Sequence, residues 1–241
     1  MSETDPQGPT PDWNAYYNHE AALHDFNPER DRVEIHRCFA ALSVFPKDSA
    51  NASLLDAGCG NGFFCHWISS RHGLTDITGV DISEPRTELA RKRYPRAKFV
   101  TGDLSRLPFN EAQFDIVTCI EVLEHMRDPL SVIRELVRVA RKYVLITVPD
   151  RQPVRMILCP HCNKSFAQYG HIQSFDRTRL EELLREAGAV PEKTKLYYAP
   201  RGSQWGIPFW LGRLITMALR MLRPSRATFL AVRARVRPPS A

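Results

Sequence analysis

A glycine-rich turn lies between a short apolar run and a helical pattern in the first third of the chain. The apolar run covers 53–57, and the turn places glycine at alternate positions, Gly58, Gly60 and Gly62, directly after Asp56. A turn this sharp needs residues that adopt positive φ and let a ligand come close to the backbone, and glycine does both. The sequence therefore predicts a strand, a tight turn and a helix, with a ligand bound at the turn.

The spacing of these glycines indicates which ligand the turn suits. Dinucleotide-binding loops follow the pattern G-x-G-x-x-G and place a pyrophosphate at the helix N-terminus. Here the pattern is G-x-G-x-G, and the carboxylate of Asp56 comes just before it. Because a carboxylate repels an anion and attracts a cation, a cationic ligand is favoured over a nicotinamide dinucleotide.

Strand patterns and helix patterns alternate along the chain. Strands are expected near 53–57, 77–81, 97–101, 114–119, 142–148, 190–198 and 227–236, and helices near 62–71, 83–94, 129–141 and 176–187. Such alternation indicates parallel strands joined by crossover helices, with the ligand at the carboxyl ends of the strands. The predicted fold class is α/β, a doubly wound, mostly parallel sheet. Further helices are expected near 13–24 and 30–43, ahead of the first strand, and near 205–223.

Acidic residues follow the later strands as well. Asp81 ends the second strand, Asp103 and Leu104 follow the third, and Glu121 follows the fourth. With the glycine turn before them, these residues resemble, in order, the motifs of class I S-adenosylmethionine-dependent methyltransferases of the type 11/12-like group, over roughly residues 50–150. The resemblance implies a seven-stranded Rossmann-like sheet whose last strand is inserted antiparallel, and S-adenosylmethionine as the cofactor.

The resemblance also implies which residues contact that cofactor. The acid before the glycine turn faces the cationic end, the second acid takes the ribose hydroxyls, and the third acid and its neighbour contact adenine. The expected cofactor residues are Asp56, Gly58, Gly60, Gly62, Asp81, Ile82, Asp103, Leu104 and Glu121.

Two histidines are expected on the acceptor side of the site. His125 follows the fourth strand, and His171 lies in a loop ahead of the helix that Asp176 caps and Gly188 ends. An imidazole has a pKa suited to proton transfer near neutral pH, so both histidines are candidate catalytic bases. The predicted reaction is methyl transfer to a small-molecule acceptor, apolar or lipid-linked, with transfer to oxygen slightly favoured.

Metal binding is an open alternative at two places. Glu121, Glu124, His125 and the distant His171 resemble the divalent-ion site of small-RNA 2′-O-methyltransferases, but the sequence E-V-L-E-H also occurs in metal-free enzymes. The segment Cys159-Pro-His161-Cys162 is half of a zinc-ribbon pattern, and structural zinc needs four ligands. The prediction is therefore a site without metal.

Two further functions stay open beside the small-molecule enzyme. One is a metal-dependent RNA 2′-O-methyltransferase, although nucleic-acid binding is disfavoured because no RNA-binding module is recognisable. The other is a binding protein that keeps the cofactor fold without turnover. The intact acid-glycine turn, together with Asp81 and Asp103, argues against that second alternative.

Charge is distributed unevenly along the chain, and the basic C-terminal part indicates which partners the chain could bind. The segment from Arg201 onward holds eight arginines and no acidic residue, whereas the remainder carries 25 basic and 27 acidic side chains. Within it, 205–223 forms an amphipathic pattern with Arg213, Arg220 and Arg223 on one face, which suits either an anionic membrane surface or a lid on the chain's own domain.

The expected organisation is a disordered lead-in over 1–12 and one methyltransferase domain over 13–241. That domain comprises a cofactor-binding core at 50–150, a substrate-side insertion at 150–175 and the basic helix. The lead-in has no apolar core of a signal peptide, and several cysteines fall in predicted core elements, so a reduced, cytoplasmic location is expected, with peripheral membrane contact as the alternative. The sequence does not fix the oligomeric state.

Overall fold

The computed structural model describes residues 12, 14–16, 18, 32–158, 160, 163–199 and 228–237. Its main feature is a seven-stranded sheet in the order β3-β2-β1-β4-β5-β9-β8. The strands are β1 (Leu54–Ala57), β2 (Ile77–Asp81), β3 (Lys98–Thr101), β4 (Phe114–Ile120), β5 (Ala140–Pro149), β8 (Ala189–Tyr197) and β9 (Phe229–Val236). The strand β9 runs antiparallel to both of its neighbours, and the other printed pairings in this sheet are parallel. The predicted doubly wound fold with an inserted antiparallel strand is confirmed.

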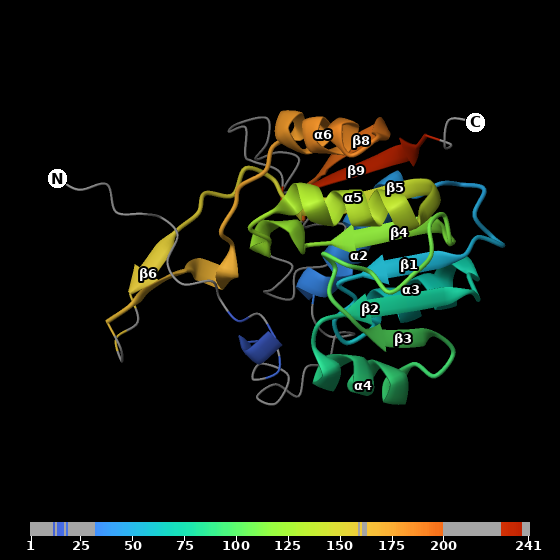
Figure 1. Ribbon diagram of the computed structural model, residues 1–241, viewed down its shortest axis with the longest axis horizontal. Helices are drawn as coiled ribbons and strands as arrows, with labels where there is room; N and C mark the ends of the chain where they lie inside the picture. The colour runs from blue at the N-terminus through green and yellow to red at the C-terminus, as the bar shows by residue number, and fades with distance from the viewer. Residues whose placement is uncertain are drawn as a thin grey trace.

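Helices cover both faces of this sheet (Figure 1). The helices are α2 (Arg32–Val44), α3 (Phe63–His72), α4 (Glu84–Arg93), α5 (Pro129–Val139) and α6 (Arg177–Glu186), with short 3-10 turns η1 (Leu123–His125) and η2 (Gln168–Gly170). One apolar core packs α2, α3 and α4 against one face, and a second packs α5 and α6 against the other. Neighbouring strand residues such as Leu54 and Leu55 point into different cores, as the alternation of side chains along a strand requires.

Side-chain caps begin two helices, α5 and α6, and only the Asp176 cap of α6 was predicted. Asp128 and Asp176 accept backbone N–H bonds at the starts of α5 and α6. Gly188, with φ of 92°, follows the end of α6, a left-handed conformation that glycine adopts without strain. Ser83 stands at the start of α4, but its side chain does not cap that helix; its hydroxyl donates instead to the side-chain oxygen of Asn18 at 2.8 Å.

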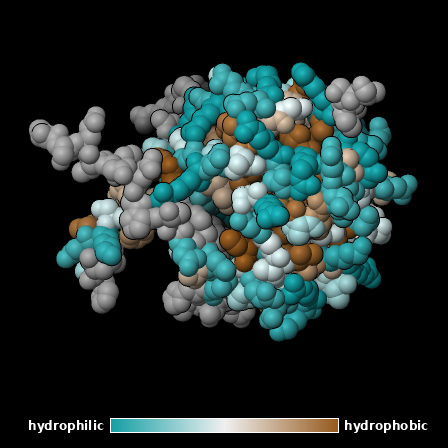
Figure 2. Space-filling model, in the orientation of Figure 1, coloured by the Kyte–Doolittle hydropathy of each residue, from teal (hydrophilic) through white to brown (hydrophobic). Residues whose placement is uncertain are grey.

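A small hairpin within the 150–175 insertion was not predicted. The strands β6 (Met156–Leu158) and β7 (Ser165–Ala167) pair antiparallel and project away from the main sheet (Figure 1). Met156, Leu158 and Phe166 on it are all exposed, and Figure 2 shows apolar side chains on this projecting part. Because an isolated hairpin buries little surface, the alternating pattern that marks the core strands is missing here.

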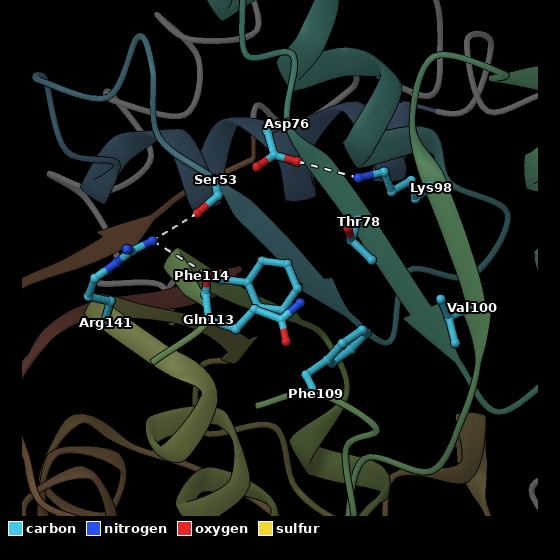
Figure 3. Close-up of a pocket in the computed structure, with 9 residues that line it drawn as sticks. All are labelled: Ser53, Asp76, Thr78, Lys98, Val100, Phe109, Gln113, Phe114 and Arg141. Carbon is cyan, nitrogen blue, oxygen red and sulfur yellow. Dashed lines mark hydrogen bonds and ion pairs between the residues drawn. The ribbon is translucent and has the colours of Figure 1, made fainter. Parts of the chain in front are cut away.

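A pocket of about 330 Å³ opens at the amino ends of the central strands (Figure 3). Asp76 and Lys98 line it and form an ion pair at 4.0 Å, and Arg141 donates to the backbone oxygen of Gln113 at 3.4 Å. Open α/β sheets bind their ligands at the carboxyl ends of the strands, and the glycine turn follows the carboxyl end of β1. This pocket therefore lies at the opposite ends of the strands from the glycine turn and is not the candidate site.

Several predicted features lie outside the described residues. These are the lead-in at 1–11, most of the helix near 13–24, the residues Cys159, His161 and Cys162, and the basic segment 205–223. Among the described residues, no helix is both long enough and apolar enough to cross a membrane.

Candidate active site

The three glycines of the turn after β1 differ in what surrounds them. All three have positive φ, between 53° and 81°. A Cβ at Gly58 would lie 2.5 Å from Val122 Cγ2, and one at Gly62 would lie 2.7 Å from the ring of Phe99, so both positions pack tightly against their own domain. A Cβ at Gly60 would meet nothing closer than Arg86 Nη1 at 3.7 Å. Gly60 is thus the glycine that leaves open space beside the loop, where a ligand can approach the backbone.

Asp81, at the carboxyl end of β2, holds this loop in place. One carboxylate oxygen accepts from the amide of Gly60 at 2.8 Å, and the other accepts from the amide of Ser83 at 3.0 Å. The side chain is buried. The structure therefore joins the glycine turn and the start of α4 through one carboxylate, and the role of Asp81 toward the ribose hydroxyls stays a prediction.

Asp56 lies beneath the loop and is almost fully buried. Its oxygens accept from the hydroxyl of Thr118 at 2.8 Å and from the thiol of Cys65 at 3.7 Å. Burial raises the pKa of Asp56 to about 7, although the bonds from Thr118 and Cys65 oppose the rise. A cationic ligand above the loop would favour the charged form of this carboxyl.

The remaining predicted cofactor residues lie at the ends of β2 and β3. Ile82 is half-buried directly after Asp81, and Leu104 is buried after β3. Asp103 is exposed, and its carboxylate accepts from the amide and hydroxyl of Ser105 at 2.9 and 2.7 Å. These residues follow the carboxyl ends of adjacent strands, the same edge as the glycine turn.

Part of the N-terminal segment lies over this edge. The bond between Ser83 and Asn18 connects it to the turn after β2. Tyr16 nearby is exposed, and Trp13 and Tyr17 lie outside the described residues. This contact places the described part of the segment beside the turn after β2.

The carboxyl end of β4 forms the other half of the site. Glu121 has a φ of 54°, unusual for a residue with a side chain, and its buried carboxylate accepts from the hydroxyl of Thr147 on β5 at 3.0 Å. The following Val122 packs against Gly58 and so connects the two halves. Such backbone strain is common at functional sites.

Glu124, in η1, is the most unusual residue of this half. Its side chain is 1 % exposed, yet neither carboxylate oxygen accepts a hydrogen bond from the part of the chain that the structure describes. Burial and the neighbouring charge of Glu121 raise its pKa well above the usual range. A buried carboxylate without partners is costly, and such groups call for a physical explanation.

The two predicted histidines meet at this carboxylate. Nε2 of His125 and Nε2 of His171 lie 4.0 and 3.9 Å from the same Glu124 oxygen, and the two rings are 4.9 Å apart, edge to face. Burial lowers the pKa of both, for His125 to about 4, where His171 adds to the effect. Both rings are therefore neutral near pH 7. The structure thus brings together His125 and His171, which are 46 positions apart in sequence.

Three supporting residues were not predicted. Gly170 and Gln152 supply oxygens to the Nδ1 atoms of His125 and His171, at 3.1 and 3.2 Å. Burial lowers the pKa of Arg37 on α2, but the charges of Glu34, Glu121 and Glu124 outweigh this and raise it. No local motif marks these positions, because Gly170 and Gln152 contact histidines 45 and 19 positions away, and Arg37 senses Glu121 and Glu124 as well as its neighbour Glu34.

Comparisons with known proteins agree with this arrangement. The profile of the family described as "Methyltransferase domain" matches residues 55–146. A probable S-adenosylmethionine-dependent methyltransferase of Mycobacterium tuberculosis is 30% identical over 61% of this chain and 53% of its own length. A 27-O-demethylrifamycin SV methyltransferase of Amycolatopsis mediterranei is 31% identical over 67% of this chain and 60% of its own length. The chain thus spans little more than half the length of these relatives.

A solved structure shares the fold at low sequence identity. It is a 1,6-didemethyltoxoflavin-N1-methyltransferase of Burkholderia thailandensis with bound S-adenosylhomocysteine. It is 19% identical to this chain, with a TM-score of 0.57 over 98% of this chain and 94% of that one. The likeness supports the order of strands and helices described above.

Proposed function

Because the chain belongs to the class I S-adenosylmethionine-dependent methyltransferase family, we propose that the protein transfers a methyl group from S-adenosylmethionine to an oxygen atom of a small-molecule acceptor. The observation that carries this proposal is the juxtaposition of an open glycine loop with a cluster of proton-binding side chains at the same sheet edge. The cluster consists of Glu124, His125 and His171.

Two observations at the glycine loop support binding of the cofactor that the family implies. The space beside Gly60 would be filled by any side chain, and Asp81 already fixes the Gly60 amide. When bound, the cofactor supplies a methyl group on a sulfonium sulfur, which keeps the electron pair as the carbon moves to the acceptor. The residues of the chain hold the two reactants in line and exclude water, and such positioning supplies on the order of 7–11 kcal/mol in favourable reactions.

Transfer to oxygen is proposed because of the other half of the site. A hydroxyl acceptor must lose its proton, so a group that receives the proton is needed near the reacting oxygen. We assign that task to His125, with His171 beside it, since both neutral imidazoles lie where β4 ends. A relative that methylates 27-O-demethylrifamycin SV supports an oxygen acceptor.

Binding and turnover can be tested separately. Calorimetry should show S-adenosylhomocysteine binding and no heat with NAD; tight NAD binding alone would overturn the assignment. Labelled S-adenosylmethionine should then be offered with lipid, quinone, glycan and RNA fractions. Label in the small-molecule fractions is the expected result. Label in RNA would favour the RNA methyltransferase, and cofactor binding without label in any fraction would favour the binding protein.

Contact with an anionic membrane is a further part of the proposal. It rests on the sequence 205–223, which lies outside the described residues and pairs Arg213, Arg220 and Arg223 with an apolar remainder. Each basic residue near an anionic surface contributes about 1 kcal/mol. Sedimentation should show binding to anionic vesicles that weakens with salt and with replacement of the three arginines by glutamine. Equal behaviour with neutral vesicles would favour the lid, and with it an acceptor that is not lipid-linked.

A further inference from the structure

We propose that Glu124, His125 and His171 form a binding site for one divalent transition-metal ion. One carboxylate oxygen and two imidazole nitrogens from these residues lie within 4.8 Å of one another. The three side chains come from η1 and from the segment after η2, so the fold assembles them from separate parts of the chain. The sequence prediction was a site without metal, and the geometry favours the alternative.

The first argument is the direction of the two imidazole rings. Nδ1 of His125 lies 3.1 Å from the backbone oxygen of Gly170, which can only accept, so Nδ1 carries the proton. Nδ1 of His171 lies 3.2 Å from the side-chain oxygen of Gln152 and carries its proton for the same reason. In a neutral ring the lone pair is then on Nε2, the atom of each histidine that faces Glu124. Metal-binding histidines are held in this way by a second set of oxygens.

The second argument is the carboxylate itself. Both oxygens of Glu124 are buried without a hydrogen-bond partner among the described residues. The guanidinium of Arg37 does not supply the missing hydrogen bond: its Nη1 pairs with Glu34 on the same helix, and its Nε is itself buried without a hydrogen-bond partner among the described residues. Glu121 faces the region as well, but its carboxylate accepts from Thr147 and is not one of the three clustered groups. A cation between Glu124 and the two imidazoles would satisfy a carboxylate that is otherwise left bare.

The donor set indicates which ions fit. Two imidazoles and one carboxylate suit Zn²⁺ and its neighbours Co²⁺, Fe²⁺ and Ni²⁺, whereas Mg²⁺ and Ca²⁺ prefer oxygen donors throughout. In a tetrahedral zinc site with bonds near 2.0–2.1 Å, ligand atoms are about 3.4 Å apart. The Glu124 oxygen lies 3.9 and 4.0 Å from the two histidine nitrogens, and all three atoms lie within 4.8 Å of one another, so ion binding would draw them together by about 0.5 to 1.4 Å.

Three protein ligands leave at least one position of the ion open. Zinc sites that do chemistry have three protein ligands and an open position, whereas purely structural ones have four. With the ion bound, His125 would act through it and would no longer take the proton itself. An acceptor hydroxyl at the open position would have a lowered pKa and would pass its proton to water; its oxygen would then take the methyl carbon while the sulfur keeps the bonding electron pair. This role rests on the proposed function, but binding of the ion does not.

Metal binding can be measured without acceptor or cofactor. The full chain, stripped with a chelator and dialysed, is titrated with Co²⁺ and followed by visible absorption, and Zn²⁺ is then measured by competition with a chromophoric chelator. We expect one equivalent of Co²⁺ with weak bands typical of nitrogen and oxygen ligands. Glu124→Gln and His171→Ala should each weaken binding by at least tenfold, since even a change in the surroundings of a ligand typically costs 10–100-fold.

Two control variants make the result specific. His72→Ala removes an exposed histidine at the end of α3 and should leave binding unchanged. The double variant Cys159→Ser, Cys162→Ser removes both thiols of the half zinc-ribbon pattern. It should also keep the Co²⁺ absorption bands that are typical of nitrogen and oxygen ligands. A signal that disappears in the cysteine variant and persists in Glu124→Gln would overturn the proposal, as would the absence of a Co²⁺ signal in a folded protein. Calorimetry with S-adenosylhomocysteine on the same samples tests the cofactor half independently, so the two proposals can fail separately.

Discussion

The two halves of the candidate active site differ in how completely their polar groups are paired. In the cofactor half, both oxygens of Asp81 and both oxygens of Asp56 accept hydrogen bonds from neighbouring residues. In the acceptor half, the equally buried Glu124 accepts none from the described residues. A half that is fully paired is ready to receive a ligand of fixed shape. A half that buries a bare carboxylate is incomplete until an ion, a proton or a substrate group arrives.

The halves also differ in how the chain builds them. The cofactor half comes from three neighbouring strand ends, those of β1, β2 and β3, and Asp81 binds the amide of Gly60 in the loop. The acceptor half is assembled from η1 and the segment around 170–171, which meet where the rings of His125 and His171 pack together. Val122 connects this half to the glycine turn, because it lies against Gly58. A change in one half should therefore leave much of the other half's function intact.

The largest expected effect comes from filling the space beside the glycine loop. Gly60→Val places a side chain where a Cβ meets only Arg86 Nη1 at 3.7 Å, so the fold should persist while ligand space is lost. We expect S-adenosylhomocysteine affinity to fall at least 100-fold in calorimetry. The backbone strain of a side chain at positive φ should cost about 1–2 kcal/mol of unfolding free energy.

Gly73→Val is the matched control for that strain. Gly73 also has positive φ and no neighbour within 4 Å, but it follows α3 at the end remote from the loop. The Gly73→Val variant should lose a similar amount of unfolding free energy and keep its affinity for S-adenosylhomocysteine. Equal loss of affinity in both variants would mean that strain alone, and not the space at Gly60, explains the result.

The next largest effect should come from the acceptor half. His125→Ala should lower kcat by on the order of 10²–10⁴-fold, the range expected when a group that handles the acceptor proton is removed. Cofactor affinity should change little, because the cofactor loop is paired without His125. Comparing kcat with S-adenosylhomocysteine affinity on the same sample measures this split. A variant with full kcat on the true acceptor would make His125 a packing residue.

The sequence was informative where function depends on neighbouring positions. Gly60 and Asp81 were predicted because a strand, a turn and an acid at the next strand end follow one another within about twenty residues. The strand and helix positions were also predictable from periodicity, since each core strand alternates between two apolar cores.

The acceptor half was predictable only in its residue types. His125 and His171 were named, but no local pattern reveals that Gln152 and Gly170 orient their rings. Nor does any reveal that Glu124 accepts no hydrogen bond from the described residues. Such facts depend on which segments meet in space. The hairpin of β6 and β7 was missed for a related reason: its exposed strands bury too little apolar surface to produce a strand pattern.

A smaller effect is expected from Asp56, in the cofactor half, on how the free energy of unfolding depends on pH. Burial raises the pKa of Asp56 to about 7, from about 3.9 in an unfolded chain. Between these values the unfolded state has lost the proton that the folded state keeps, so stability falls as pH rises from about 4 to 7. Asp56→Asn should flatten this slope and raise the unfolding free energy at pH 8 by on the order of 1–3 kcal/mol.

Urea unfolding at several pH values, without ligand, measures the slope of the unfolding free energy against pH. Asp48→Asn changes an exposed acid and should leave the slope unaltered. Glu121, whose pKa burial also raises to about 7, contributes a slope of the same sign, so some dependence on pH should persist in Asp56→Asn. An unchanged slope in Asp56→Asn would show that the charge of this residue is not destabilised in the folded protein.

The smallest expected effect tests whether the N-terminal segment belongs to the cofactor half. The hydroxyl of Ser83 donates to Asn18 at 2.8 Å, and this bond connects the segment to the turn that Asp81 organises. A single hydrogen bond of this kind contributes about 0.5–1.5 kcal/mol. Ser83→Ala and Asn18→Ala should each weaken S-adenosylhomocysteine binding by about two- to fivefold, and the double variant by no more than either single one, because both remove the same bond. If the two losses instead multiply in the double variant, the residues act separately, and the segment does not close over the cofactor through this contact.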